Sequence, residues 1–218
     1  MKQPIFYTVG DSPALLHARN LLQSWGYDLS PIPNEHVTHL LLPVPSFSEP
    51  GIVKGGRKLN DILKDLPENL TILGGNLGTL PYHTEDFLKD EYYLAENAAI
   101  TAHCALKRIM AQFPGILQHV PVLIIGWGRI GKHLAAMLRS LGADVTVAAR
   151  KESDRYALKL QQYKAVDPAK WELKQYAIIV NTAPAPIMTQ AEAKKALQEL
   201  YLTAKTVGLE EQVTAQIP

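Results

Sequence analysis

The stretch VLIIGWGRIGKHLA, residues 122–135, constrains the fold more than any other part of the chain. Its glycines, Gly126, Gly128 and Gly131, follow the spacing G-x-G-x-x-G. In a strand–turn–helix unit such glycines permit a tight turn, close approach of the backbone to a pyrophosphate, and close packing of helix on strand. The N–H groups and dipole at the helix start then favour an anion. The glycines alone are weak evidence, so the flanking sequence decides.

The residues around the glycines fit a strand–turn–helix–strand unit. Residues 121–126 are apolar, and apolar residues recur at helical spacing over 129–141. A second strand is predicted over 143–149, where a dinucleotide-binding unit requires it. A glycine corner without a ligand is the alternative. The residues predicted to hold a pyrophosphate are Gly126, Trp127, Gly128, Arg129, Ile130 and Gly131.

The end of the second strand distinguishes between cofactors. NAD sites usually place Asp or Glu about 20 residues beyond the glycines, where the carboxylate binds the ribose hydroxyls. Here that position is Arg150, with Lys151, Ser153 and Arg155 beside it. A guanidinium can hold a 2′-phosphate with two hydrogen bonds, which predicts NADP rather than NAD. The alternative is a solvated loop whose neighbouring acidic residues partly neutralise these charges.

The segment IIVNTAPAPI, residues 178–187, is the next informative stretch. It reads as a buried strand that ends in polar residues, after which prolines forbid simple continuation. Ligands in open α/β sheets bind at the carboxyl ends of the strands. We expect Thr182, Ala183 and Pro184 to line the nicotinamide side of the site. A loop that is merely stiffened by proline is the alternative.

Short apolar runs alternate with longer amphipathic segments along the chain, which indicates the α/β class. Further strands are predicted over 5–10, 39–44, 70–75 and 176–181, and helices from Pro13 to Gly26 and over 58–66, 90–112 and 153–162. The first half has the pattern of a small parallel sheet with crossover helices. The long helical pattern that precedes Pro114 has the length to bridge two domains.

Charge and composition exclude several classes of protein. The 218 residues carry 22 basic and 21 acidic side chains, which gives no reason to expect a nucleic-acid or membrane surface as partner. No apolar run approaches the length of a membrane span, and the N-terminal apolar stretch is too short for a signal peptide. One cysteine, Cys104, rules out an internal disulfide and fits a reducing compartment. We therefore expect a cytoplasmic protein.

Several segments together resemble the family formed by the A subunit of dipicolinate synthase, from spore-forming bacteria. They are LLLPVPS (40–46), ILGGNLG (72–78), NAAITAHCAL (97–106), the glycine stretch, the AAR strand end and IVNTAPAPI. The resemblance implies two Rossmann-like parallel-sheet domains joined by a long helix: 1–95, a bridge over 96–114, and an NAD(P)-binding domain over 115–218. It further implies NADP-dependent oxidation of a cyclic dihydropyridine dicarboxylate, with a flavoprotein-like B subunit as partner; homo-oligomer formation is left open.

Two departures from the family pattern bear on catalysis. The family's Thr-Ala-Glu-Gly segment reads Thr101-Ala102-His103-Cys104 in this chain, so an imidazole replaces the carboxylate. The family's later Asp-Leu-Ala-Ser segment has no counterpart in LYLTAKTVGLEEQVTAQIP. We therefore expect a divergent or shortened relative. A non-catalytic NADP-binding regulatory or assembly protein is the alternative function.

The remaining candidates concern substrate and proton transfer. His103 is the best catalytic candidate, because an imidazole exchanges protons near neutral pH. Thr101, Pro45 and Ser46 are expected to contact the substrate. The alternative for Thr101 and His103, which lie on the long helix, is that they only pack or face solvent at a domain junction. His36 and His39 form an H-x-x-H spacing without further ligands, so no metal site is predicted.

Overall fold

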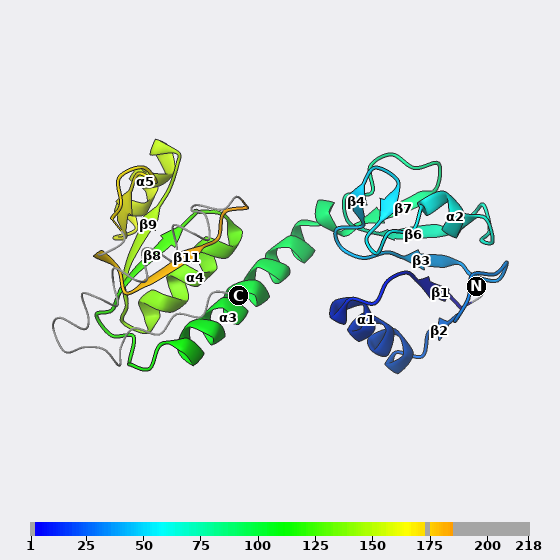
Figure 1. The fold of residues 1–218 in the computed structure, drawn as a ribbon, viewed down its shortest axis with the longest axis horizontal. Helices are drawn as coiled ribbons and strands as arrows, with labels where there is room; N and C mark the ends of the chain where they lie inside the picture. Colours follow the sequence, from blue (N-terminus) through cyan, green and yellow to red (C-terminus); the bar gives the residue numbers. More distant parts are fainter. Residues whose placement is uncertain (1–2, 173–174, 185–218) are drawn as a thin grey trace. The chain divides into compact units, whose positions relative to one another are not determined.

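The computed structural model describes residues 3–172 and 175–184, and two parallel sheets organise them (Figure 1). The α/β class expected from the sequence is confirmed. The chain divides into two compact units, Met1–Leu94 and Ala95–Pro218. The limits 1–95, 96–114 and 115–218 stay predictions as domain boundaries, and residues 185–218 of the last lie outside the described residues.

The first unit contains a five-stranded parallel sheet in the order β2-β1-β3-β6-β7. Its strands are β1 (Ile5–Thr8), β2 (Asp28–Leu29), β3 (His39–Leu41), β6 (Thr71–Gly74) and β7 (His83–Asp86). An antiparallel hairpin of β4 (Phe47–Glu49) and β5 (Ile52–Val53) stands apart from it. The helices are α1 (Pro13–Ser24), α2 (Leu59–Leu63) and the 3₁₀ turn η1 (Phe87–Lys89).

Helix α1 begins and ends as its sequence predicts. The Ser12 hydroxyl caps the helix by accepting a hydrogen bond from the Leu15 backbone N–H at 3.3 Å, and Pro13 occupies the first turn. Gly26 follows with a φ of +82°, a conformation that favours glycine. The core beneath the sheet consists of buried Tyr7, Val9, Val37, Leu40, Leu42, Val53, Leu59, Ile62, Leu70, Ile72 and Leu77.

Some elements of the first unit differ from the expectation. The helix expected over 58–66 ends at Leu63, where Leu66 forms a turn and Pro67 follows. Strand β7, with the sequence HTED, lies at the edge of the sheet and carries no apolar alternation. Strands such as β7 form by pairing with a neighbour, so sequence periodicity does not reveal them.

The second unit contains a four-stranded parallel sheet in the order β10-β9-β8-β11. Its strands are β8 (Pro121–Ile125), β9 (Asp144–Ala148), β10 (Lys164–Val166) and β11 (Ile178–Asn181). The helices are α3 (Glu91–Gln112), which begins before the division at residue 94, α4 (Arg129–Ser140) and α5 (Glu152–Leu160). This strand order is the beginning of the Rossmann order, 3-2-1-4.

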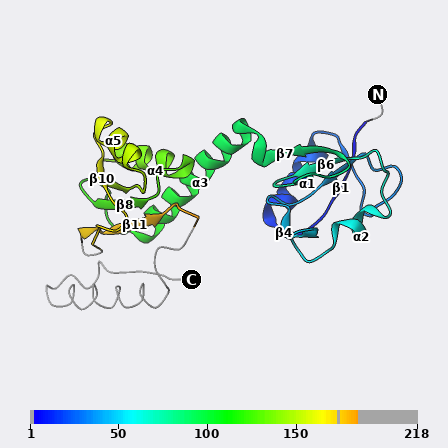
Figure 2. The ribbon, with the colours of Figure 1, turned by 90° about the horizontal axis from the view of Figure 1, so that it is seen from above.

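Both faces of the second sheet are covered, which explains the continuous apolar character of β8. Val122 and Ile124 point into a core formed with Leu134 and Leu138 of α4 and Leu158 of α5. These helices therefore lie on the same face of the sheet (Figure 2). On the opposite face, Leu123 and Ile125 pack with Ala148, Val166, Trp171, Tyr176 and Ile179. Strands buried on both faces are typical of parallel sheets.

The register of the second sheet brings three strand ends to one level. Ile125 at the end of β8 lies opposite Ala148 of β9 and opposite Asn181 of β11. The three segments that follow these strands therefore begin at the same edge. Within residues 3–172 and 175–184, none of the helices combines the length and hydrophobicity that a membrane span needs.

Candidate functional site

The glycine turn leaves β8 in a conformation that requires its first glycine. Gly126 has a φ of +107°, which L-residues rarely adopt. Its N–H donates to the Ala148 carbonyl at 2.9 Å, so the turn starts directly at the β8–β9 edge. Gly128 is the N-cap of α4 with extended backbone and offers no side-chain cap. The first backbone N–H groups of this helix therefore have no side-chain cap from the N-cap residue.

The three glycines meet three different steric conditions. A Cβ at Gly131 would lie 2.4 Å from the Gly126 carbonyl oxygen and 3.0 Å from the Thr182 hydroxyl oxygen. A Cβ at Gly126 would lie 2.8 Å from the same hydroxyl. A Cβ at Gly128 would meet no atom within 4 Å among the described residues. Two glycines are thus required by packing inside the protein, whereas Gly128 borders open space.

Thr182 ties the end of β11 to the glycine turn. Its hydroxyl donates to the Ile125 carbonyl at 3.0 Å and lies 3.4 Å from the Gly126 carbonyl, and its N–H also donates to Ile125 at 2.9 Å. The Ala183 N–H donates to the Asn181 side-chain oxygen at 3.0 Å. The structure therefore brings Thr182 and Ala183 beside the glycines, and Pro184 is the last described residue of this loop.

The N-terminus of α4 is electropositive. Its first turn contains no acidic residue and includes Arg129 and Lys132. The Lys132 ammonium lies 5.8 Å from the centre of the Trp127 ring, which itself packs edge-on against Tyr163 at 5.6 Å. Ile130 packs against the core of this unit. The Trp127 side chain thus packs against the rest of this unit, while its backbone forms part of the turn. Backbone N–H groups at such a helix start favour an anion.

The predicted selectivity residues lie where β9 gives way to α5. Arg150 follows the strand and is exposed, Lys151 is the N-cap of α5, and Ser153 is exposed in the first helical turn. Arg155 differs from these three, because its guanidinium is directed back to the protein. It donates to the Ala149 carbonyl at 2.7 Å and to the Arg150 carbonyl at 2.8 Å.

The guanidinium of Arg155 also pairs with Asp167, which follows β10. The Nη1–Oδ2 distance is 3.4 Å, and the two side chains are 21% and 38% exposed. The sequence placed Arg155 beside the predicted phosphate-binding residues Arg150, Lys151 and Ser153 and gave no signal for Asp167. The pairing depends on β10 lying beside β9, so nothing in the local sequence indicates it.

Ser46, predicted to contact substrate, is fully buried in the first unit. Its hydroxyl donates to the Pro43 carbonyl at 2.8 Å and accepts from the Gly75 N–H at 2.9 Å. Its backbone N–H donates to the Gly75 carbonyl at 2.8 Å. Pro45 precedes it with a cis peptide bond and is half-buried. These contacts give Ser46 a structural role in joining two loops.

The candidates on α3 bind their own helix. The Thr101 hydroxyl donates to the Asn97 carbonyl at 2.7 Å. Nδ1 of His103 lies 2.9 Å from the Ala99 carbonyl, and because a carbonyl only accepts, this nitrogen carries the proton. His103 and Cys104 are exposed. Side chains with such bonds to the preceding turn are held along the helix.

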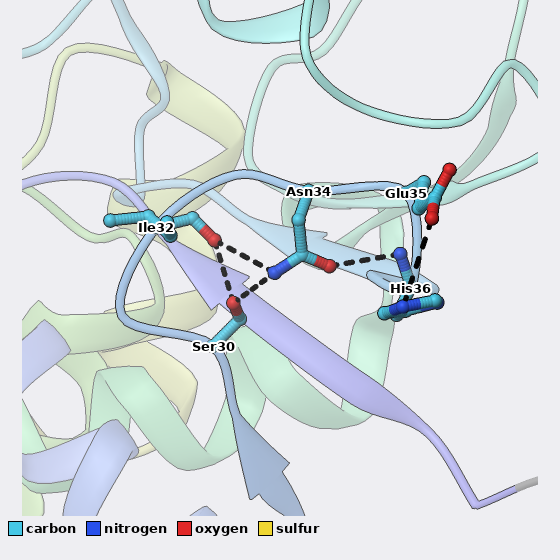
Figure 3. A network of polar contacts seen from close by, with 5 residues as sticks. All are labelled: Ser30, Ile32, Asn34, Glu35 and His36. Carbon is cyan, nitrogen blue, oxygen red and sulfur yellow. Dashed lines mark hydrogen bonds and ion pairs between the residues drawn. The ribbon is translucent and has the colours of Figure 1, made fainter.

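His36 and His39 occupy different environments. His36 is in a loop where Asn34 donates to the Ser30 hydroxyl at 2.7 Å and accepts from the His36 N–H at 2.9 Å (Figure 3). His39 lies in β3 and stacks near Phe6, and burial together with the charge of His83 lowers its pKa. Among the described residues no group of three potential metal ligands occurs.

Comparisons with known proteins identify the fold class. No family model matches the chain, and no curated protein sequence matches it significantly. The dipicolinate synthase A chain from Bacillus subtilis matches with a TM-score of 0.65 and 17% identity, over 89% of this chain and 77% of that one. The corresponding protein from Bacillus halodurans matches with a TM-score of 0.67 and 18% identity, over 90% and 78%. The chain therefore resembles the A subunit of dipicolinate synthase in fold.

Other dehydrogenases share the same architecture. Salmonella D-lactate dehydrogenase matches with a TM-score of 0.50 and 11% identity, over 90% of this chain and 68% of that one. The resemblance that the sequence segments indicated is therefore confirmed at the level of the fold. What these neighbours have in common with the chain is its α/β fold with parallel sheets.

Proposed function

We propose that the second unit binds NADP(H) and that the chain is an NADP-dependent oxidoreductase resembling the A subunit of dipicolinate synthase. The observation that carries the proposal is that a Cβ at Gly128 would meet no atom of the described residues within 4 Å, whereas internal packing requires the glycines on either side of it. A pyrophosphate at this point would meet the N–H groups of residues 126–131 at the start of α4. The electropositive first turn of α4 favours the same ligand.

The exposed cations after β9 support NADP over NAD. Arg150 and Lys151 follow the strand directly, and Ser153 adds a hydroxyl donor within the same helical turn. Such a set of donors suits a 2′-phosphate. An NAD site would instead have a carboxylate at the position of Arg150 to accept hydrogen bonds from the free ribose hydroxyls. Thr182, Ala183 and Pro184 would border the nicotinamide, which supplies the hydride chemistry when bound.

We further propose a cyclic dihydropyridine dicarboxylate as substrate. Its oxidation would release a hydride to NADP⁺ and a proton to the solvent or to a base, which leaves an aromatic dicarboxylate. His103 is the candidate base, because its Nδ1–H is bound to Ala99 and Nε2 is then the basic nitrogen. Thr101, Pro45 and Ser46 complete the proposed substrate residues, and a flavoprotein-like B subunit is the proposed partner.

A non-catalytic NADP-binding protein is the second candidate function. The bonds of Thr101 and His103 to their own helix favour it, since both side chains already have partners within α3. Activity assays with the dihydro acid and NADP⁺, with and without the B subunit, separate the two functions. Binding of NADPH without formation of pyridine dicarboxylate would select the second.

Isothermal titration with NADPH and NADH tests the cofactor proposal directly. Gly128→Ala should lower the unfolding midpoint only slightly, because its Cβ meets no atom of the described residues and alanine is only a poorer N-cap for α4, yet it should weaken NADPH binding at least about tenfold. His133→Ala, exposed on the same helix, is the matched control and should bind as the unmodified protein does. Equal affinity for NADH would contradict the assignment of Arg150, and unchanged affinity of Gly128→Ala would contradict the site.

A further inference from the structure

The segment after β9 is held by one guanidinium that joins three parts of the second unit. Arg155 extends from α5 and donates to the carbonyls of residues 149 and 150 at 2.7 and 2.8 Å. It also pairs with Asp167 beyond the end of β10. The Arg155 guanidinium on the following helix therefore holds the backbone of residues 149 and 150 through hydrogen bonds to their carbonyls.

Asp167 is itself held in place. Its other carboxylate oxygen accepts from the Ala169 N–H at 3.0 Å, and the Asp167 carbonyl accepts from the Lys170 N–H at 2.9 Å. The two strand ends are further joined because the Ala149 N–H donates to the Val166 carbonyl at 3.1 Å. The Arg155–Asp167 pair thus connects a carboxylate held just after β10 to the backbone just after β9.

The charge of Arg155 is already compensated at this position. A carboxylate and two carbonyl oxygens surround its Nη1, and the side chain is 21% exposed. Arg150 has no side-chain hydrogen bond or ion pair within the described residues and is exposed. The two arginines, five residues apart, therefore have different roles: one is presented to solvent and the other fixes the presenting backbone.

We propose that Arg155 is a positioning residue for 2′-phosphate selectivity and acts through the backbone of Arg150 rather than by contacting the phosphate. The proposal rests on the proposed NADP site. Binding of the phosphate by Arg150 and Lys151 requires ordering of their segment, and a segment ordered in advance loses less freedom on binding. NADH lacks the 2′-phosphate, so its affinity does not depend on this ordering.

Two variants and a control test the proposal by titration with NADPH and NADH. Arg155→Lys keeps the charge but replaces the longer, planar guanidinium, whose Nη1 reaches two carbonyls and a carboxylate, by an ammonium on a shorter side chain. We expect its NADPH dissociation constant to rise about three- to tenfold while that of NADH stays within about twofold. Arg139→Lys is the matched control, because Arg139 also donates to a carbonyl, that of Gln161 at 2.8 Å, but lies at the C-terminal end of α4. It should change neither constant.

Asp167→Asn separates positioning from direct contact by the sign of its effect. If Arg155 positions the loop, loss of its carboxylate anchor weakens NADPH binding. If Arg155 contacts the phosphate, removal of the competing carboxylate strengthens NADPH binding, and the proposal is overturned. An unchanged ratio of the two dissociation constants in both variants also overturns it.

Amide hydrogen exchange of the unliganded protein provides a readout that does not involve the cofactor. Faster exchange over residues 150–153 in Arg155→Lys or Asp167→Asn, with the glycine turn unchanged, supports the proposal; unchanged exchange contradicts it. Failure of the proposed function gives a different result, because the unmodified protein would then bind neither dinucleotide. Should Arg155→Lys fail to fold, Asp167→Asn alone decides.

Discussion

Ser46 shows how a residue that suggests a ligand contact in the sequence can also serve the fold. The PVPS loop follows a buried strand, where polar groups often meet substrate, and that position motivated the prediction. In the structure the hydroxyl connects Pro43 and Gly75 inside the first unit. This contact depends on the position of Gly75 just after β6, a tertiary feature that local sequence does not contain.

Replacement of Ser46 by alanine should therefore reduce stability rather than cofactor affinity. The Gly75 N–H would lose its hydroxyl acceptor in a fully buried place, which costs about 1–3 kcal/mol in the free energy of unfolding. Urea unfolding measures this change. Ser48→Ala, exposed nearby, is the control. A stable Ser46→Ala protein that loses turnover would instead support a substrate contact.

His39 should make stability depend on pH below neutrality. Its pKa in the folded protein is lowered, so the unfolded chain binds the proton more readily. The stabilisation is complete above the unfolded value of about 6.5 and is lost as the pH falls from there toward the folded pKa. Urea midpoints between pH 7.5 and 5 should fall less steeply in His39→Gln. An identical slope would show that other groups cause the dependence.

At the scale of elements, Asp86 joins the end of β7 to two neighbouring turns. Its carboxylate accepts from the N–H groups of Asn76, Leu77 and Leu88, each at 3.0 Å. Burial raises the pKa of Asp86, but these three hydrogen bonds and the charge of Lys89 outweigh it, so the net pKa is lowered. The carboxylate form thus stabilises the folded chain.

The stabilisation by Asp86 should be present at neutral pH and lost in acid. A lowered folded pKa contributes stability above the unfolded value of about 3.9, and this contribution disappears as the pH falls through the folded pKa. Asp86→Ala should lower the free energy of unfolding by about 1 kcal/mol at pH 7 and by less at pH 2.5. Urea unfolding at both pH values measures this, and Asp61→Ala, a surface partner of Lys64, should have little effect.

The sequence predicts the elements of the second unit better than those of the first. Strand β8 is a continuous apolar run, strand β9 is mostly apolar, helix α4 has clear helical periodicity, and glycines stand at defined places between them, so all three elements lie where expected. In the first unit, β2 has two residues and β7 carries polar side chains, and neither has a periodic signal. For the site, the glycines and Thr182 follow from sequence, whereas the Arg155–Asp167 pair arises only when β10 joins β9.

At the scale of the whole chain, the two units have separate hydrophobic cores. The cluster around Leu40 and Ile72 belongs to the first unit, and those around Ile124 and Leu123 belong to the second. We expect calorimetry to show two unfolding transitions. NADPH at about 100 times its dissociation constant should stabilise only the second unit, by about 2.7 kcal/mol. A shift of both transitions would show that the units unfold together.

The common level of the three strand ends has a consequence for insertions and deletions. One residue added within β8 would rotate its side chains to the opposite face and displace Gly126 from Ala148 and Thr182 together. Length changes in homologous chains should therefore be absent from 121–126 and accumulate in the turn before it, around Gly115 and Ile116, where the Ile116 side chain is 78% exposed.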